Sequence, residues 1–213
     1  MRCLAVLLLI SAPALAEDKP VLDPLLADTQ GSVALYLQAL QLADLGALHK
    51  DPLLVLTAAR ILHGLSVTDT ARVPDPAPSA PEPVRPPEAP ALLDLARKLD
   101  AGQNYGDLID TLAREVPPHP QSLAATAATL APGQSQVWTL PFFGGDHSEL
   151  AILGQGKSNL DLLVMGPGDT QICLDRGSAD AAFCGFVLVE NGDVLVTVTN
   201  VGTAEASYLL LTE

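Results

Sequence analysis

Aromatic residues are scarce in this chain. One Trp, three Tyr and four Phe occur among 213 residues. A sugar-binding face built from several exposed rings is therefore hard to assemble, and Trp138 and Phe142 are the pair best placed to form one. These two residues are four apart on an expected strand, so their side chains point to the same side. Two interpretations stay open: an exposed stacking face, or a part of the hydrophobic core.

Basic residues are also few. Eleven Lys and Arg stand against 25 Asp and Glu, which gives a formal net charge of −14. Nucleic acids and anionic membrane surfaces are bound through basic patches. The charge balance therefore argues against both as partners, but it does not identify a partner. A protein and a polysaccharide both stay open. Nothing in the composition indicates an oligomeric state.

Long apolar runs are absent apart from residues 4–10, which read Leu-Ala-Val-Leu-Leu-Leu-Ile after Arg2. Pro13 and the small-residue sequence Ala14-Leu15-Ala16 follow. This order is typical of a secretory signal peptide, and the run is too short to cross about 30 Å of hydrocarbon as a helix. We therefore expect residues 1–16 to be removed, leaving a periplasmic or secreted protein that is not inserted in a membrane. The alternative is an uncleaved anchor.

Cysteine is limited to three residues, of which Cys3 lies in the expected signal peptide. Cys173 and Cys184 remain, an even pair in an oxidising compartment. We predict a disulfide between them, which would stabilise the fold by about 3 kcal/mol. A zinc site is the weaker alternative, because two cysteines without neighbouring histidines make an incomplete ligand set.

Helical patterns occupy the first half of the mature chain. In residues 17–72, Val33, Leu37 and Leu40 recur at helical spacing, and Asp51-Pro52 is typical of a helix start. We expect a helical hairpin there. Residues 73–90 are dense in proline and are predicted to be a linker or exposed loop. A helical pair is expected in 91–118, packed on the first hairpin as a small bundle, and 119–130 as a second linker.

The pattern changes to strands after residue 131. Short apolar segments such as Val194–Thr199 alternate with turns rich in Gly, Asn and Asp, including 166–169 and 191–193. Regular spacing of such strands is typical of a β-sandwich. The predicted fold class is α+β, with an N-terminal small helical bundle followed by an antiparallel, jelly-roll-like β-sandwich at 131–213.

The strand-rich segment carries an ordered set of motifs. They are Ala131-Pro132-Gly133, Val137–Leu140, Asn159–Val164, Gly166–Asp169, Gly192–Asn200 and Tyr208–Leu210. As a set they resemble the bacterial pre-peptidase C-terminal domain, over about residues 130–213, under half of the mature chain. The resemblance implies a small sandwich attached to secreted proteins, not itself catalytic, which accompanies a peptidase or serves in binding or secretion.

Candidate chemistry in this segment is limited to loop carboxylates. Asp161, Asp169, Asp175 and Asp180 supply the oxygen atoms that calcium prefers, but their spacing is not that of an EF-hand. The alternative is that they are turn or solvated residues. No other cofactor is expected, and no metal site is assigned with assurance. The sequence Gly154-Gln155-Gly156-Lys157-Ser158 is predicted to be a hairpin turn.

No catalytic constellation is visible, because the four histidines lack ligand spacing and no nucleophile elbow occurs. We therefore expect an exported, non-enzymatic accessory or binding protein, whose C-terminal sandwich is a protein- or polymer-interaction module. Two alternatives stay open. One is an enzyme or enzyme subunit with a site of dispersed carboxylates, and the other is a calcium-stabilised structural module.

Overall fold

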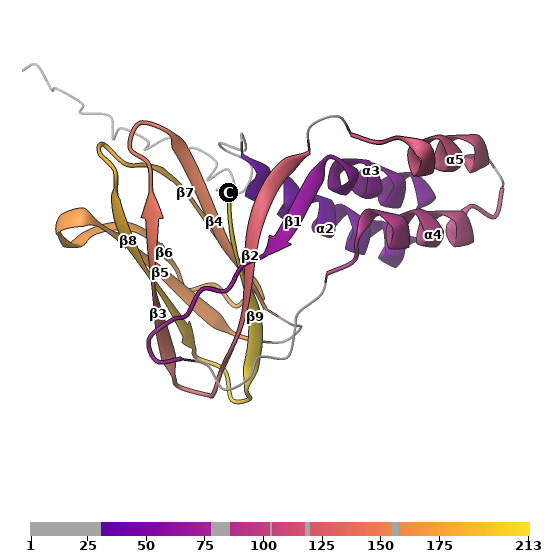
Figure 1. The fold of residues 1–213 in the computed structure, drawn as a ribbon. Coiled ribbons are helices and arrows are strands. Elements are labelled where there is room, and N and C mark those ends of the chain that lie inside the picture. Colours follow the sequence, from indigo (N-terminus) through magenta and orange to yellow (C-terminus); the bar gives the residue numbers. More distant parts are fainter. Residues whose placement is uncertain (1–30, 78–85, 103, 118–119, 155–157) are drawn as a thin grey trace, which may run out of the picture.

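The structure, a computed structural model, describes residues 31–77, 86–102, 104–117, 120–154 and 158–213 (Figure 1). The expected signal peptide at 1–16 lies outside the described residues, and so do residues 78–85 of the proline-rich stretch.

The helices follow the expected pairing. Helix α2 (Ser32–His49) and α3 (Pro52–His63) form the first hairpin, and α4 (Ala89–Leu99) and α5 (Gly106–Arg114) form the second pair. The start of α3 is set by Asp51, whose Oδ1 accepts hydrogen bonds from the backbone N–H groups of Leu53 and Leu54 at 2.8 and 3.3 Å. An N-cap carboxylate followed by proline at the first helical position satisfies the exposed donors of the first turn.

The strands form two sheets. In the five-stranded sheet the order is β1-β2-β9-β4-β7, and in the four-stranded sheet it is β3-β8-β5-β6. All pairs are antiparallel except β1 with β2, which is parallel. The strands are β1 (Leu65–Asp69), β2 (Gln121–Leu130), β3 (Ser135–Phe142), β4 (His147–Gly154), β5 (Leu160–Gly166), β6 (Thr170–Asp175), β7 (Ala181–Val187), β8 (Gly192–Asn200) and β9 (Ala206–Thr212), with a 3₁₀ turn, η1 (Pro167–Asp169), after β5.

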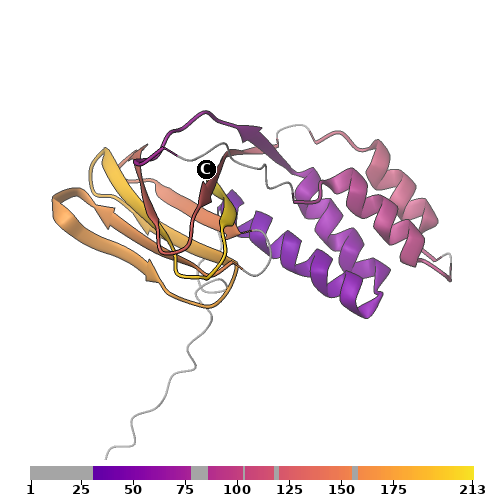
Figure 2. The same ribbon diagram turned by 90° about the horizontal axis from the view of Figure 1, so that it is seen from below.

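The described part of the chain has three layers: helices, the five-stranded sheet and the four-stranded sheet. Figures 1 and 2 show the helices on one side of the sandwich, with β5 and β6 on the far side. One hydrophobic core lies between the two sheets, and a second lies between the helices and the five-stranded sheet. Leu123 of β2 and Leu211 of β9 belong to the helix-facing core, whereas Leu130 and Leu210 of the same strands belong to the core between the sheets.

Two of the segment boundaries predicted from the sequence are wrong. Residues 119–130 were expected to be a linker, but Gln121–Leu130 is the ten-residue strand β2. The helical region expected to reach residue 72 ends at His63, and Leu65–Asp69 is strand β1. Strand β2 is rich in Ala and Thr rather than in bulky β-branched residues, so its sequence lacks the usual strand signal. The strand is stable because both of its faces are buried.

The two edges of the sandwich are joined in different ways. The disulfide between Cys173 of β6 and Cys184 of β7 links the outer strand of one sheet to the outer strand of the other. This confirms the predicted disulfide. On the opposite side, the segment after β1 passes from the five-stranded sheet to the four-stranded sheet. The Thr70 N–H donates to the Ala125 carbonyl of β2, and Asp75 pairs with Val137 of β3.

Candidate functional site

Trp138 and Phe142 lie in the core between the sheets. These residues are 1% and 8% exposed, so they form no stacking face. Trp138 packs edge-on against Tyr208, and its Nε1–H donates to the Tyr208 hydroxyl at 2.9 Å. Phe142 packs edge-on against Phe186. The core alternative of the sequence analysis is therefore the observed one.

The four candidate aspartates have separate surroundings. The carboxylate of Asp161 lies 3.9 Å from the Arg176 guanidinium, and the Asp175 carboxylate accepts the Gly177 N–H at 2.8 Å within a local turn. Asp169 sits at a positive φ in the turn after β5, and Asp180 lies 3.4 Å from the Ser158 hydroxyl. Within the described ranges, no group of three or more His, Cys, Asp or Glu is placed to hold a metal ion. Calcium binding stays a prediction from the sequence.

A cleft of about 350 Å³ opens where the helices meet the five-stranded sheet. Its walls come from α2, α3, the start of α4, and strands β1, β2 and β9. This volume is at the lower end of the roughly 300–1,000 Å³ that ligand sites occupy. The lining residues are Tyr36, Leu62, His63, Leu65, Val67, Asp69, Pro86, Pro87, Glu88, Ala89, Pro90, Ala125 and Leu209.

Strand β1 supplies one wall of the cleft. Leu65, Val67 and Asp69 alternate along the strand and share one face, because successive side chains of a strand point to opposite sides. Leu65 packs on the helix-facing core, while Val67 is 41% exposed. The wall therefore passes from apolar to acidic along five residues.

Three prolines also line the cleft. Pro86 and Pro87 precede Glu88, and Pro90 lies in the first turn of α4, where a missing N–H is tolerated. Proline fixes φ, so the backbone of this part of the cleft lining is locally stiff. Part of the stretch expected to be a linker or loop therefore lines a cavity.

Tyr36 of α2 is one of the residues that line the cleft, and it is 5% exposed. Burial, together with the nearby negative charge of Glu88, raises the pKa of its hydroxyl to about 12. The hydroxyl is therefore protonated at neutral pH. A protonated hydroxyl of this kind can donate a hydrogen bond.

His63 also borders the cleft, at the last residue of α3. Its Nε2 lies 2.7 Å from the Glu115 carbonyl oxygen. The guanidinium of Arg60 lies 3.5 Å from the Glu115 carboxylate. These contacts hold the end of α3 against the segment after α5.

A buried carboxylate that the sequence analysis did not single out lies at the start of α2. Glu149 of β4 is fully buried, and its two oxygens accept the N–H groups of Gly31 and Ala34 at 3.1 and 2.9 Å. The Nε2 of His147 lies 3.2 Å from the same carboxylate. Both carboxylate oxygens are thus occupied in holding a helix, which is a structural use. No local signal reveals it, because the partners are more than 100 residues apart in sequence.

Glu213 completes this contact. Its carboxylate accepts hydrogen bonds from the Ser32 backbone N–H and from the Ser32 hydroxyl, both at 2.8 Å. Two carboxylates from the sheet therefore satisfy the N–H groups at the positive end of the α2 dipole.

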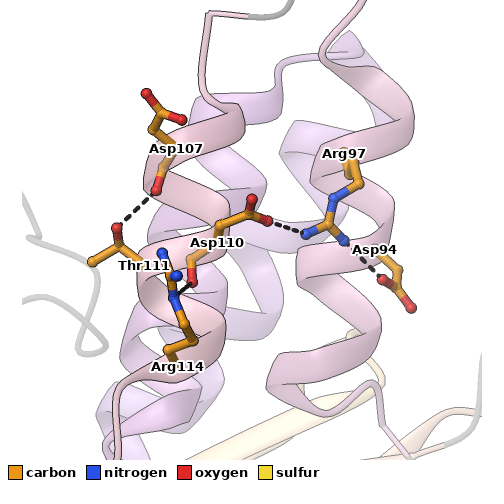
Figure 3. A network of polar contacts seen from close by, with 6 residues as sticks. All are labelled: Asp94, Arg97, Asp107, Asp110, Thr111 and Arg114. Atoms are coloured by element: carbon orange, nitrogen blue, oxygen red, sulfur yellow. Dashed lines mark hydrogen bonds and ion pairs between the residues drawn. The ribbon is translucent and has the colours of Figure 1, made fainter.

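The α4–α5 pair carries an exposed polar network (Figure 3). Arg97 of α4 reaches Asp94 at 3.2 Å and Asp110 of α5 at 2.8 Å. Within α5, the Thr111 hydroxyl donates to the Asp107 carbonyl and the Arg114 Nε–H donates to the Asp110 carbonyl. Arg97 is the residue that joins the two helices, and its exposure indicates a surface contact rather than a binding site.

Comparison with known proteins gives structural neighbours only. No protein-family model matches the chain, and no curated protein matches it. A pre-peptidase C-terminal domain of a Bacillus anthracis collagenase has 12% identity and a TM-score of 0.37, over 42% of this chain and 87% of that one. This neighbour is the same kind of domain that the sequence resembles, and the described strands form the expected β-sandwich.

Two further neighbours cover a similar share of the chain. The periplasmic inhibitor of g-type lysozyme from Aeromonas hydrophila has 17% identity and a TM-score of 0.33, over 43% of this chain and 84% of that one. A designed double-stranded β-helix has 15% identity and a TM-score of 0.28, over 42% and 97%. Such distant likenesses carry no argument about function, which has to come from the residues of this chain.

Among the residues that the structure describes, no helix has the length and apolar character that a membrane span requires.

Proposed function

We propose that this chain is an exported, non-enzymatic binding protein, whose site is the cleft between the helices and strands β1, β2 and β9. The observation that carries the proposal is the make-up of this cleft, in which aliphatic and proline residues stand beside Tyr36, His63, Asp69 and Glu88, so that its surface is mixed polar and apolar. Ligand sites combine apolar lining residues with a small number of polar groups. The sandwich supplies three strands to the cleft, which is how it would act as an interaction module.

The ligand class follows from size and charge. The cavity of about 350 Å³ accommodates a few side chains, as an extended segment of a protein or polymer would present. Asp69 and Glu88 place carboxylates on its rim, in a chain with a net charge of −14. Opposite charge speeds encounter and fixes register. We therefore expect a ligand that is neutral or basic, with an acceptor that meets the Tyr36 hydroxyl.

The disulfide between Cys173 and Cys184 fits an extracellular or periplasmic location, because disulfides persist in oxidising compartments. The signal-peptide pattern at residues 1–16 favours the same placement. Together they support binding outside the cytoplasm.

Site-specific photo-crosslinking tests the proposal. A photoreactive phenylalanine analogue replaces Val67 in the cleft wall, and in a matched variant it replaces Leu48, which is 76% exposed on α2 and does not line the cleft. The exported protein is irradiated in its native host. We expect a defined adduct from position 67 and none from position 48. Equal labelling at both positions, or no adduct at position 67, would contradict a cleft-based binding function.

A second pair of variants tests the charge argument. Glu88→Gln removes a rim carboxylate, whereas Glu190→Gln removes one outside the cleft lining. Adduct formation at position 67 should fall several-fold with the first variant and stay unchanged with the second. A fall with both would indicate that net charge, rather than the rim, controls capture.

A further inference from the structure

Strand β7 is the outer strand of the five-stranded sheet. It pairs with β4 on one side, and no described strand lies on its other side. An outer strand presents a row of unpaired backbone N–H and C=O groups. Proteins usually protect such a strand with charged residues, proline, a bulge or short length.

The other three outer strands carry such protection. Strand β3 contains Pro141 and is bridged by Asp75. Strand β1 is five residues long and ends at Asp69. Strand β6 faces a register irregularity in β5 and ends at Asp175, next to Arg176. Strand β7 reads Ala-Ala-Phe-Cys-Gly-Phe-Val over seven residues, with no charge and no proline.

The sequence of β7 is also self-complementary in size. An antiparallel pairing of two copies about a two-fold axis at Cys184 sets Phe183 opposite Gly185. It sets Phe186 opposite Ala182, and Val187 opposite Ala181. Each pair then joins a larger residue to a smaller one on the same face of the sheet, so two bulky side chains do not meet directly opposite each other. We propose that β7 pairs with β7 of a second copy of this chain, continuing the five-stranded sheet through a symmetric dimer.

The surroundings of β7 favour this occupant. The disulfide of Cys184 ties the strand to β6, so the edge is held in place before association. A cavity of about 250 Å³ is lined by residues 183–187 together with His147 of β4 and Cys173 of β6. Val187 at the end of the strand is 58% exposed, and Val189 just beyond it is 95% exposed. A two-fold interface uses the same patch on both subunits, and a neutral strand is the part of a chain of charge −14 that meets its own copy without like-charge contact.

Sedimentation velocity of the disulfide-intact chain from residue 17 tests the proposal. Over a range from about 1 to about 100 µM we expect a concentration-dependent dimer. Gly185→Lys and Val187→Lys place charges on the paired edge and should raise the dissociation constant at least about tenfold. Leu48→Lys is the control, because it changes the charge equally at a residue 76% exposed on α2. A β-carbon at Gly185 would lie no closer than 3.4 Å to its neighbours, so a side chain fits there.

Hydrogen exchange on the wild-type chain gives a readout that needs no variant. Amides on the outer edge of β7 should exchange more slowly as the chain concentration rises, while those of β6 should not change. A chain that stays monomeric at about 100 µM overturns the proposal. A dimer that Gly185→Lys and Leu48→Lys weaken equally, or protection of β7 only on adding a foreign peptide, overturns it as well. None of these results bears on crosslinking at position 67, so the dimer and the cleft function are tested separately.

Discussion

At the scale of single residues, the core between the sheets is organised by a buried polar chain. The Trp138 Nε1–H donates to the Tyr208 hydroxyl, which donates to the Gln136 side-chain oxygen at 2.8 Å. The Gln136 amide in turn donates to the Thr129 carbonyl at 3.2 Å. Trp138 and Gln136 come from β3 of one sheet, and Tyr208 and Thr129 from β9 and β2 of the other. The chain of hydrogen bonds therefore fixes how the two sheets face each other.

Tyr208→Phe tests the importance of this chain. The substitution leaves the Trp138 donor and the Gln136 acceptor buried without their partner, and each such group costs about 1–3 kcal/mol. We expect the free energy of unfolding to fall by about 2–4 kcal/mol in urea titrations. Tyr105→Phe is the control, because its hydroxyl makes no hydrogen bond within the described residues. Equal losses for the two variants would contradict a specific role for the chain.

Tyr36 and Tyr208 make stability sensitive to alkali. The pKa of Tyr36 is raised to about 12, chiefly by burial, and burial raises that of Tyr208 as well. Folding therefore favours the protonated hydroxyls. Their contribution is complete below the unfolded value of 10.0 and is lost as pH rises through the folded pKa. Unfolding free energy should thus fall between about pH 10 and 12, and Tyr36→Phe should make the fall shallower. An unchanged slope in that variant would show that Tyr36 is solvated.

At the scale of elements, the join between α2 and the sheet is made by carboxylates rather than by local caps. Helix α2 has no side-chain cap from its own N-cap residue, Gly31. The carboxylates of Glu149 and Glu213 take that role from β4 and from the residue after β9. A β-carbon at Gly31 would overlap the Glu149 carboxylate, so a residue without a side chain is required there.

Glu149→Gln measures how much the contact between Glu149 and the start of α2 contributes to the free energy of unfolding. The amide keeps the size of the side chain but removes the charge that complements the α2 dipole, and only one of its two polar atoms accepts a hydrogen bond. We expect a loss of about 1–3 kcal/mol in the free energy of unfolding. Hydrogen exchange should accelerate in the first turn of α2 more than in α5. Glu190→Gln serves as the matched control, and an equal loss there would contradict the assignment.

Elements with local signals could be predicted from the sequence, and those set by distant contacts could not. Asp51-Pro52 marked the start of α3 because the cap is made within three residues. The disulfide followed from an even pair of cysteines. Strand β2 was missed because its Ala and Thr residues become a strand only between two layers. The cleft and the Glu149 contact were missed because their members come from segments far apart in the sequence.

At the scale of the whole molecule, stability depends on three layers that share the five-stranded sheet. The helix-facing core and the inter-sheet core both use β2, β4 and β9. Loss of either layer would expose one face of these strands. We therefore expect a single cooperative unfolding transition, although the sequence divides into helical and strand-rich halves.

Removing the disulfide tests how the far edge of the sandwich is held. Replacing Cys173 and Cys184 by Ala together frees β7 from β6, and the chain-entropy model assigns about 3 kcal/mol to a crosslink of this loop length. The two cysteines are 11 residues apart in sequence. We expect a lower urea midpoint with an unchanged α2–α5 helical signal in circular dichroism. No change in midpoint would mean that the edge is held by packing alone.

The contact between Ser32 and Glu213 has a consequence for how the chain is made. These residues are 181 positions apart, and the N–H groups of Gly31 and Ala34 likewise donate to Glu149, more than 100 residues later in the chain. During synthesis the first turn of α2 therefore lacks the partners of its N–H groups until β4, β9 and Glu213 have left the ribosome. Contacts of such long sequence separation make folding slow. A chain that folds slowly stays unfolded for longer after synthesis, which would suit the export proposed above.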